Sequence, residues 1–166
     1  MKILICGDSY SDNRCIINGH IPNNTWIDQL GQIYDVQCMG EGGASNEEVY
    51  KQLLSADVWD FALVSLTPSS RGRFSGKFAL KLIKTRNVYC WSPFITYRNI
   101  KGVDWQPFVL HNEMFIKQLH ENEYYQGNYT FTGCHFTREG NKTVFEHMRF
   151  IIEHMLGRSD ERWLIK

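Results

Sequence analysis

The fold is decided by the opening stretch of the sequence, Lys2-Ile3-Leu4-Ile5-Cys6-Gly7-Asp8-Ser9. Its first part, Lys2–Cys6, is a short apolar run closed by a glycine, which is typical of a buried strand. A strand that is apolar on both sides is expected inside a parallel sheet whose two faces are covered. The polar residues that follow, Asp8 and Ser9, then lie at the carboxyl end of the strand, the edge of such sheets where ligands bind.

Strand and helix patterns alternate along the rest of the chain. The expected strands are Asp35–Met39, Phe61–Leu66 and Asn87–Trp91, and the expected helices are Thr25–Ile33, one that starts after Ser45, Phe74–Ile83, Phe108–Leu119 and Arg138–Leu156. This alternation predicts an α/β fold with a parallel sheet between layers of helices. Neither a repeat nor a linker rich in proline, glycine or serine interrupts it, so we expect one domain over residues 1–166.

Local signals support two of these helices. Ser45 is followed three residues later by Glu48, the pattern of a capping box at a helix start. In the last helix Val144 and Met148 recur at helical spacing and predict a buried face. His147 falls on the same helix, and we expect it to face solvent.

Composition excludes several classes of function. The 18 lysines and arginines balance 18 acidic residues, which argues against nucleic acid or an anionic membrane as the partner. No stretch reaches the length of a membrane span, and the opening apolar run is too short for a signal-peptide core, so we expect a soluble cytoplasmic protein. The five cysteines lack metal-type spacing and are expected as free thiols, and no ligand cluster predicts a metal or another cofactor.

Three polar segments fall where such a sheet would place a site. The first is Gly7-Asp8-Ser9, in which the serine becomes a nucleophile if a base reaches it. The second is Gly42–Asn46, whose glycines and helix start suit the binding of negative charge. The third contains His135, a residue type that acts as a general base near neutral pH. Each segment also has a purely structural explanation. The first would cap a helix, the second would be an ordinary glycine turn, and the histidine of the third would lie on the surface.

Taken in order, these segments resemble the motifs of the SGNH (GDSL-type) hydrolase superfamily. The matching residues are Gly7-Asp8-Ser9, Gly43-Ala44-Ser45, and His135 followed by Thr137 and Gly140 ahead of the last helix. The resemblance spans nearly the whole chain. It implies a flavodoxin-like three-layer α/β/α sandwich and serine hydrolase chemistry of the esterase, lipase or deacetylase type, without a metal or cofactor. The chain length and the serine-rich block after the third strand are similar to members encoded by bacteriophages, for which association with a virion is also expected.

The resemblance implies a role for each matched residue. Ser9 would attack the carbonyl of an ester, and His135 would take the proton of the serine hydroxyl and return it to the leaving alcohol. The backbone N–H groups of Ser9 and Gly43 would hold the oxyanion that develops. The expected substrate is a small ester, such as an O-acetyl group on a carbohydrate; a thioester or a lipid acyl chain is the alternative.

Two positions depart from the pattern of the family. After the third strand the family carries Gly-x-Asn-Asp, whose asparagine completes the oxyanion hole, whereas this chain has Ser65–Ser70 without an asparagine. The candidate replacement donors are Asn46, Thr67 and Ser69. The family also carries an aspartate three residues before the histidine, where this chain has Thr132. Thr132 would orient the imidazole without a charge, and Asp8 is a further catalytic candidate, although its place in the turn directs it away from the histidine.

These departures leave a second class of function open: a catalytically weakened module of the same fold that binds a carbohydrate or a protein partner. The candidate residues for contact with a substrate or partner are Tyr10, Ser69, Arg71 and Trp91. Aromatic side chains in loops bind sugars or anchor interfaces, and an arginine holds an anionic group. The alternatives are core packing for the aromatics and a solvated surface charge for the arginine. A flavin- or phosphate-binding relative is disfavoured, because the chain has no Gly-x-Gly-x-x-Gly motif.

Overall fold

A computed structural model of the chain describes residues 1–14, 24–68, 71–72, 74–93, 106–122, 124–126 and 135–155. Four strands within them form one sheet: β1 (Lys2–Cys6), β2 (Asp35–Cys38), β3 (Phe61–Ser65) and β4 (Val88–Trp91). The strand order is β2-β1-β3-β4, and every neighbouring pair is parallel. The predicted α/β fold with a parallel sheet is therefore confirmed, and its order is that of the first four strands in flavodoxin-like doubly wound sheets.

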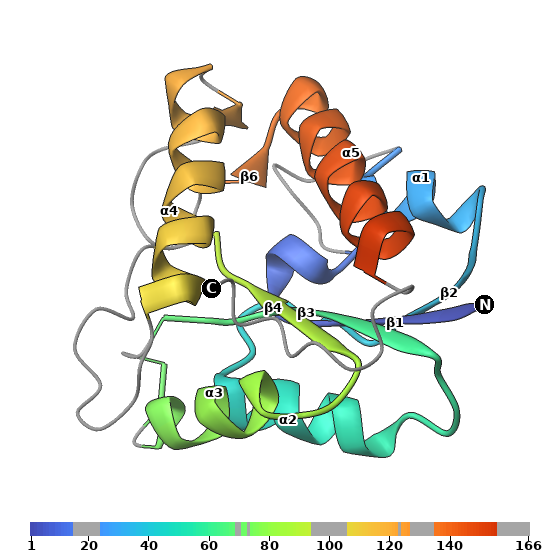
Figure 1. Ribbon diagram of the computed structural model, residues 1–166, viewed down its shortest axis with the longest axis vertical. Helices are drawn as coiled ribbons and strands as arrows, with labels where there is room; N and C mark the ends of the chain where they lie inside the picture. Colours follow the sequence, from blue (N-terminus) through green and yellow to red (C-terminus); the bar gives the residue numbers. More distant parts are fainter. Residues whose placement is uncertain are drawn as a thin grey trace.

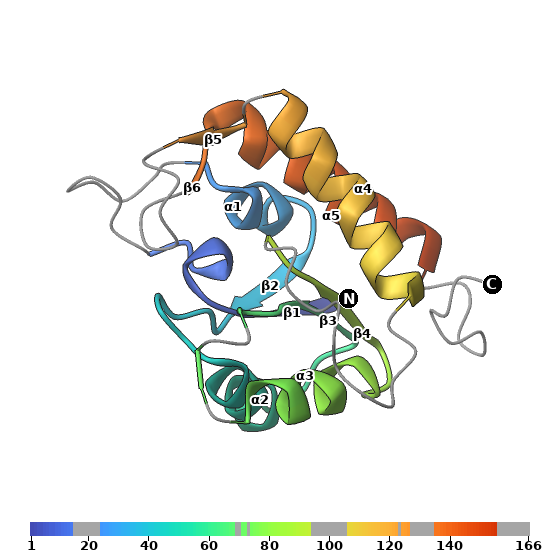
Figure 2. The same ribbon diagram turned by 90° about the vertical axis from the view of Figure 1, so that its left-hand side faces the viewer.

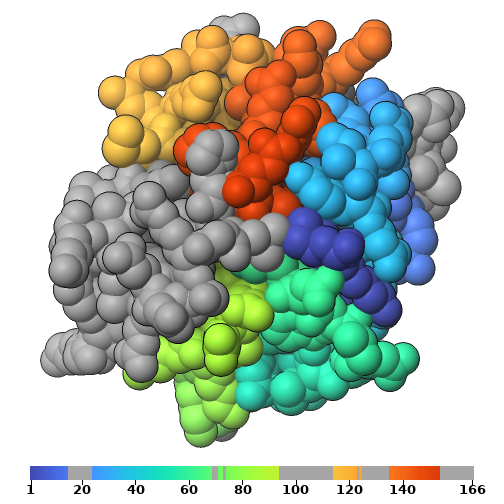
Figure 3. Space-filling model, turned by 45° about the vertical axis from the view of Figure 1, so that its right-hand side comes forward, coloured from blue at the N-terminus to red at the C-terminus, as the bar shows by residue number. Residues whose placement is uncertain are grey.

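Helices cover both faces of this sheet (Figures 1 and 2). On one face lie α2 (Asn46–Ser55) and α3 (Ser75–Ile83), and on the other lie α1 (Trp26–Gly31), α4 (Gln106–Glu121) and α5 (Arg138–Met155). On the surface shown in Figure 3, α5 lies between α1 and α4. The result is a three-layer arrangement of helices, sheet and helices.

Each face of the sheet has its own core. Ile3 and Ile5 of β1 pack with Trp26 and the apolar faces of α4 and α5, whereas Leu4 and Cys6 pack with the residues of α2 and α3. Successive side chains of a strand point to opposite faces of the sheet, so the side chains on both faces of β1 are buried. This explains why the opening run is apolar throughout rather than alternating.

Side-chain caps fix the starts of two helices. Ser45 and Glu48 form the predicted capping box at the start of α2, with the Ser45 N–H donating to Glu48 Oε2 at 2.6 Å. Thr25 and Asp28 form a second capping box at the start of α1. Because each box satisfies backbone N–H groups that the helix leaves without partners, the two helix starts are set by local sequence.

Three short elements were not predicted. They are the 3₁₀ turn η1 (Ser9–Ser11) and the antiparallel pair β5 (Tyr125–Gln126) and β6 (His135–Phe136). Elements of two or three residues are too short to show any periodicity. The structure also extends the fourth long helix beyond the predicted Phe108–Leu119, to Gln106–Glu121.

His147 does not face solvent, and that prediction was wrong. Its ring is half-buried and stacks on Phe115 of α4, with the ring centroids 3.9 Å apart. Its Nε2 lies 3.2 Å from the hydroxyl of Tyr89. The packing of α4 beside α5 covers this face of the helix, and periodicity along α5 alone cannot show that.

The cysteines agree with the prediction as far as the structure describes them. Cys6, Cys38 and Cys90 are free thiols, while Cys15 and Cys134 lie outside the described residues. Burial raises the pKa of Cys6 to about 12. In the described part of the chain, no helix combines the length and the apolar character that crossing a membrane requires.

Candidate active site

The strand order creates a switch point between β1 and β3. The chain leaves β1 toward β2 on one side and leaves β3 toward β4 on the other side. Loops that diverge in this way open a crevice at the carboxyl ends of the two strands, where ligands bind in doubly wound sheets. Gly7-Asp8-Ser9 follows β1 directly, so the predicted nucleophile stands at this crevice.

The turn that carries Ser9 is held by its neighbours. Asp8 caps η1, because its carboxylate accepts the N–H of Tyr10 at 3.2 Å and its carbonyl accepts the N–H of Ser11 at 2.8 Å. Asp8, Tyr10 and Ser11 are buried, whereas Ser9 is half-buried. The turn therefore presents the Ser9 side chain and conceals those around it.

The residue between β1 and this turn, Gly7, has to be a glycine. A Cβ atom at Gly7 would lie 2.7 Å from side-chain atoms of both Ser11 and Ser65, and the residue has a φ of +155°. The side chain of Gln52 brackets it, accepting its N–H at 2.9 Å and donating to its carbonyl at 3.2 Å. No larger residue fits where β1 passes into the turn, so the place of Ser9 depends on this glycine.

His135 reaches the same region from the far end of the sequence. It lies in β6, opposite Gln126 of β5, just before the start of α5. Its ring stacks on Tyr10, with centroids 5.5 Å apart and planes inclined by 22°. Tyr10 in turn packs edge-on against Phe136 at 5.0 Å. His135 therefore stacks on Tyr10, the residue that directly follows Ser9.

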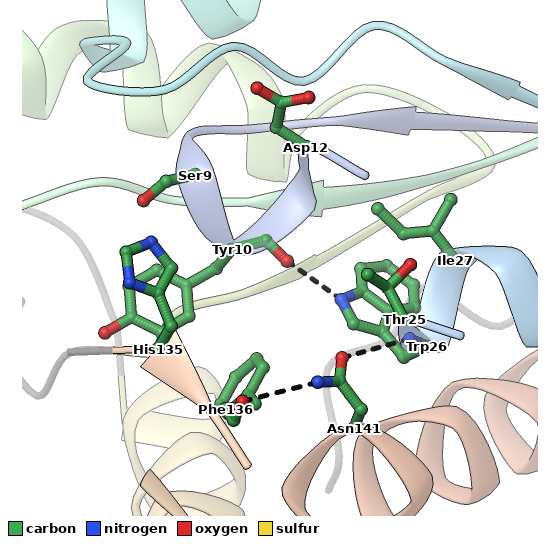
Figure 4. A pocket seen from close by; sticks show the side chains of 9 residues that line it. All are labelled: Ser9, Tyr10, Asp12, Thr25, Trp26, Ile27, His135, Phe136 and Asn141. Atoms are coloured by element: carbon green, nitrogen blue, oxygen red, sulfur yellow. Dashed lines mark hydrogen bonds between the residues drawn. The ribbon is translucent and has the colours of Figure 1, made fainter. Parts of the chain in front are cut away.

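Ser9 and His135 line one pocket (Figure 4). The remaining lining residues are Tyr10, Asp12, Thr25, Trp26, Ile27, Phe136 and Asn141. In the close view the Ser9 hydroxyl and the His135 ring lie on the same side of the pocket and point toward each other. A serine hydroxyl beside an imidazole is the pair that nucleophilic catalysis requires.

Asp8 is turned to a different partner. Its carboxylate lies 2.8 Å from Arg71 Nη1, and the Asp8 side chain is completely buried. Desolvation raises the pKa of Asp8 to about 6, against the attraction of Arg71. Asp8 is not among the residues that line the pocket with His135. In the structure this carboxylate caps the turn and forms an ion pair with Arg71; it is not placed against His135 as the third member of a triad would be.

Arg71 is held against the turn that carries Ser9. Its guanidinium pairs with the buried Asp8, and its side chain is 24% exposed. It is therefore not a fully solvated surface charge. One of its five N–H groups is used in this ion pair, and contact of the guanidinium with a substrate or partner stays a prediction.

Gly43 lies in the turn between β2 and α2, with a φ of +84° and open space where a Cβ would stand. Gly43 is exposed, and its turn follows β2, the strand that pairs with β1. The role of Gly43 and of the Ser9 N–H as oxyanion donors stays a prediction.

The predicted oxyanion donors Asn46 and Thr67 are both completely buried and are not among the residues that line the pocket of Ser9 and His135. The Asn46 amide donates to Thr67 O at 3.0 Å and to Ser75 Oγ at 2.6 Å, and its oxygen accepts the Thr67 N–H at 2.8 Å. This side chain therefore connects the start of α2 to the end of β3 and the start of α3. Its hydrogen-bonding groups are used inside the protein rather than offered to a ligand.

The two predicted aromatic contacts differ in their outcome. Tyr10 lines the pocket, but it is 7% exposed and serves mainly as the surface on which His135 stacks. Trp91 is 1% exposed and packs against Trp26 and Phe136 in the core, away from the surface where a substrate would contact it. Trp91 ends a strand, and the layer that covers it could not be inferred from the sequence. Ser69 and Thr132 lie outside the described residues.

Trp26 and Asn141 are pocket residues that the sequence reasoning missed. Trp26 falls in the expected helix Thr25–Ile33, where an apolar residue predicts core packing, and Asn141 directly follows the Gly140 of the third motif. The one available signal was an asparagine in the first turn of a helix that begins just after the candidate histidine. Among the described residues, no group of three or more histidine, cysteine or acidic side chains is placed to hold a metal ion.

Searches of protein-family models, of curated proteins and of solved structures found no significant match to this chain.

Proposed function

We propose that this chain is a serine hydrolase of the SGNH kind, with Ser9 as nucleophile and His135 as general base. One observation carries the proposal: the two side chains line one pocket beside the switch point of the sheet, although they come from opposite ends of the sequence. A serine becomes a nucleophile when a histidine beside it can accept its proton. The order of the three motifs, which resembles that of the family, supports the same assignment.

In the proposed reaction, Ser9 Oγ forms a bond to the acyl carbon of an ester while its proton passes to His135. The bond between the acyl carbon and the alcohol oxygen then breaks, and the alcohol leaves with the proton from His135. A water molecule, deprotonated by the same imidazole, releases the carboxylic acid and restores Ser9. The N–H groups of Ser9 and Gly43 stabilise the oxyanion, and removal of one such donor typically slows catalysis by about 10²–10³.

The pocket favours a small acyl group. Its volume is about 20 Å³, which is room for about one water molecule. Among O-acyl esters this favours the smallest, an acetyl ester, with the carbohydrate that carries it outside the pocket. The proposed substrate class is therefore a small O-acyl ester.

One observation favours a second candidate function, that of a binding module of the same fold. Of the three side chains expected to complete the oxyanion hole, Asn46 and Thr67 are buried and Ser69 lies outside the described residues. A site with fewer oxyanion donors binds an acyl or sugar group with little turnover. Reactivity of Ser9 separates this candidate from the hydrolase.

The test is labelling with a small fluorophosphonate probe, which reacts with activated serines. We expect wild type to be labelled, and Ser9→Ala and His135→Ala to lose at least about 100-fold in labelling rate, the loss expected on removal of a general base. Ser11→Ala is the matched control, because Ser11 lies in the same turn and its buried hydroxyl has no hydrogen-bond partner among the described residues. It should label at the wild-type rate.

The outcomes separate the two candidates. Labelling that requires both Ser9 and His135 supports the hydrolase, and hydrolysis of acetyl esters would then define its substrate. A folded wild-type protein that the probe does not label would contradict the hydrolase and favour the binding module. Equal labelling of Ser9→Ala and wild type would place the reactive serine elsewhere in the chain.

A further inference from the structure

The turn that carries Ser9 and the strand that carries His135 are linked through two side chains that the proposed reaction does not use. Trp26, at the start of α1, donates its ring Nε1–H to the carbonyl of Tyr10 at 2.8 Å. Its backbone N–H donates to Asn141 Oδ1 at 3.0 Å. Trp26 therefore holds the Ser9 turn on one side and α5 on the other (Figure 4).

Asn141 completes the link. Its amide nitrogen donates to the carbonyl of Thr137 at 3.1 Å and to that of Phe136 at 3.4 Å. Phe136 is the neighbour of His135 in β6. The continuous path is Tyr10, Trp26, Asn141, Phe136, and both of its ends adjoin a member of the Ser9–His135 pair. The ring stack of His135 on Tyr10 closes the path into a loop.

Trp26, in the middle of this path, is buried and closely packed. Trp26 is 1% exposed and packs edge-on against Trp91, with their ring centroids 5.9 Å apart. Buried hydrogen bonds in a medium of low dielectric constant are stronger than exposed ones, and groups left without partners there are unfavourable. A displacement of Asn141 would therefore disturb several bonds together. This couples the start of α5 to the Ser9 turn.

We propose that Trp26 and Asn141 are positioning residues that hold His135 against the Ser9 turn. The inference rests on the proposed function, because it assigns these residues to the Ser9–His135 pair. Both line the pocket, but neither makes nor breaks a bond in the proposed reaction. They act on the distance and orientation between nucleophile and base, a geometry in which a misplacement of about 1 Å lowers the rate by about 10².

Two Asn141 variants test this with the fluorophosphonate probe. Asn141→Leu removes all three side-chain hydrogen bonds at similar volume, and we expect its labelling rate to fall by about 10–100-fold. Asn122→Leu is the matched control, since Asn122 is an exposed asparagine that donates to a helix carbonyl at 2.7 Å, away from the pocket. It should label at the wild-type rate.

Asn141→Asp adds a readout that a loss of stability would not imitate. A protonated aspartate accepts the Trp26 N–H and donates to one of the two carbonyls, but an ionised aspartate faces both carbonyl oxygens without a donor. These oxygens raise the pKa of the new carboxyl, so the labelling rate of this variant, divided by the wild-type rate at the same pH, should be near one at low pH and fall as the pH rises. Taking the ratio at each pH removes the titration of His135, which wild type and variant share. Asp12 and His135 also line the pocket, and Asp28 lies at the start of α1 beside Trp26; both variants retain all three.

A second measurement does not depend on reactivity. The Tyr10 ring should shift the proton resonances of the stacked His135 imidazole, which are assigned by comparison with His135→Ala. In Asn141→Leu these resonances should move, while those of His147, which stacks on Phe115, stay in place. Circular dichroism at each pH verifies that the variants are folded.

The outcomes distinguish this inference from the proposed function. If wild type labels through Ser9 and His135, but folded Asn141→Leu labels at the wild-type rate, the positioning role is overturned and the hydrolase stands. If wild type does not label, the proposed function fails, and the His135 resonances decide whether the link places the ring. Resonances that are unchanged in Asn141→Leu overturn the link in either case.

Discussion

The buried carboxylate of Asp8, the residue directly before Ser9, lies 2.8 Å from Nη1 of Arg71. The two partners are unequal, because the Asp8 side chain has no exposed surface and that of Arg71 is 24% exposed. Desolvation of the carboxylate outweighs the attraction of the guanidinium and raises the pKa of Asp8 to about 6. The turn that carries Ser9 is therefore built around a carboxyl that titrates near neutral pH.

This carboxyl should make the free energy of unfolding depend on pH. Its pKa is about 6 in the folded chain against an ordinary value of 3.8, so the folded state binds more protons between these values. The stability from the protonated group is fully present below about pH 4 and is lost as the pH rises through about 6, a change of about 3 kcal/mol. Urea unfolding of wild type and Asp8→Asn across this range measures it. A pH dependence that Asp8→Asn leaves unaltered would contradict the assignment.

At neutral pH, removal of Arg71 and removal of Asp8 should change the free energy of unfolding by different amounts. Arg71→Gln leaves an uncompensated buried carboxylate, and we expect a loss of about 3 kcal/mol in unfolding free energy. Asp8→Asn leaves a guanidinium that water can reach, and it should change stability by about 1 kcal/mol or less. Near pH 4 the effect of Arg71→Gln should shrink, because Asp8 is then protonated. Equal losses for the two variants at neutral pH would argue against this asymmetry.

Asn46→Leu should destabilise the fold through the bonds that its amide makes. The substitution removes the amide that pairs with both the N–H and the carbonyl of Thr67 in a buried place. We expect a loss of about 2–4 kcal/mol, since each unsatisfied buried group costs about 1–3 kcal/mol. Asn122→Leu, at an exposed position, should stay within about 0.5 kcal/mol of wild type. Chemical denaturation compares the two, and similar midpoints would contradict the structural role of Asn46.

Sequence reasoning succeeded where the signal is local. The apolar run of β1 showed that both of its faces are covered, and Ser45 with Glu48 showed where α2 begins. The capping box joins residues that are three positions apart in the sequence. The burial of both faces of β1 follows from the alternation of side chains along a strand. The parallel sheet also agrees with the alternation of strand and helix patterns along the chain.

The same reasoning failed where partners lie far apart in the chain. Arg71 is 63 residues from Asp8, and the Thr67 N–H that Asn46 accepts is 21 residues away. A polar residue at the carboxyl edge of a sheet can face the crevice or bond inward, and only the packing of the layers decides which. Asn141 was missed for this reason, because its three bonds have meaning only once α1 and β6 are adjacent.

The cysteines of the sheet should be protected from alkylation. Cys6 is buried with its pKa raised to about 12, and burial raises the pKa of Cys90 further. Because the thiolate is the reactive form, neither should react with iodoacetamide near pH 8 in the folded protein. Both should react after unfolding in urea. Peptide mass spectrometry locates the alkylated sites, and modification of Cys6 or Cys90 under native conditions would contradict the buried placement of β1 and β4.

The steric role of Gly140 explains why a glycine follows the candidate histidine. A Cβ at this position, in the first turn of α5, would overlap the carbonyl oxygen of Tyr124. That carbonyl accepts the N–H of Thr137 at 2.8 Å, so it is fixed in place, and Gly140→Ala should cost about 1–3 kcal/mol. Gly31→Ala is the matched control: a Cβ at Gly31, at the end of α1, meets nothing within 4 Å, and alanine should stabilise by about 0.4–1 kcal/mol. Thermal unfolding of both variants should give shifts of opposite sign. A Gly140→Ala variant as stable as wild type would mean that α5 does not lie against Tyr124, and the placement of His135 by the start of that helix would then have to be abandoned.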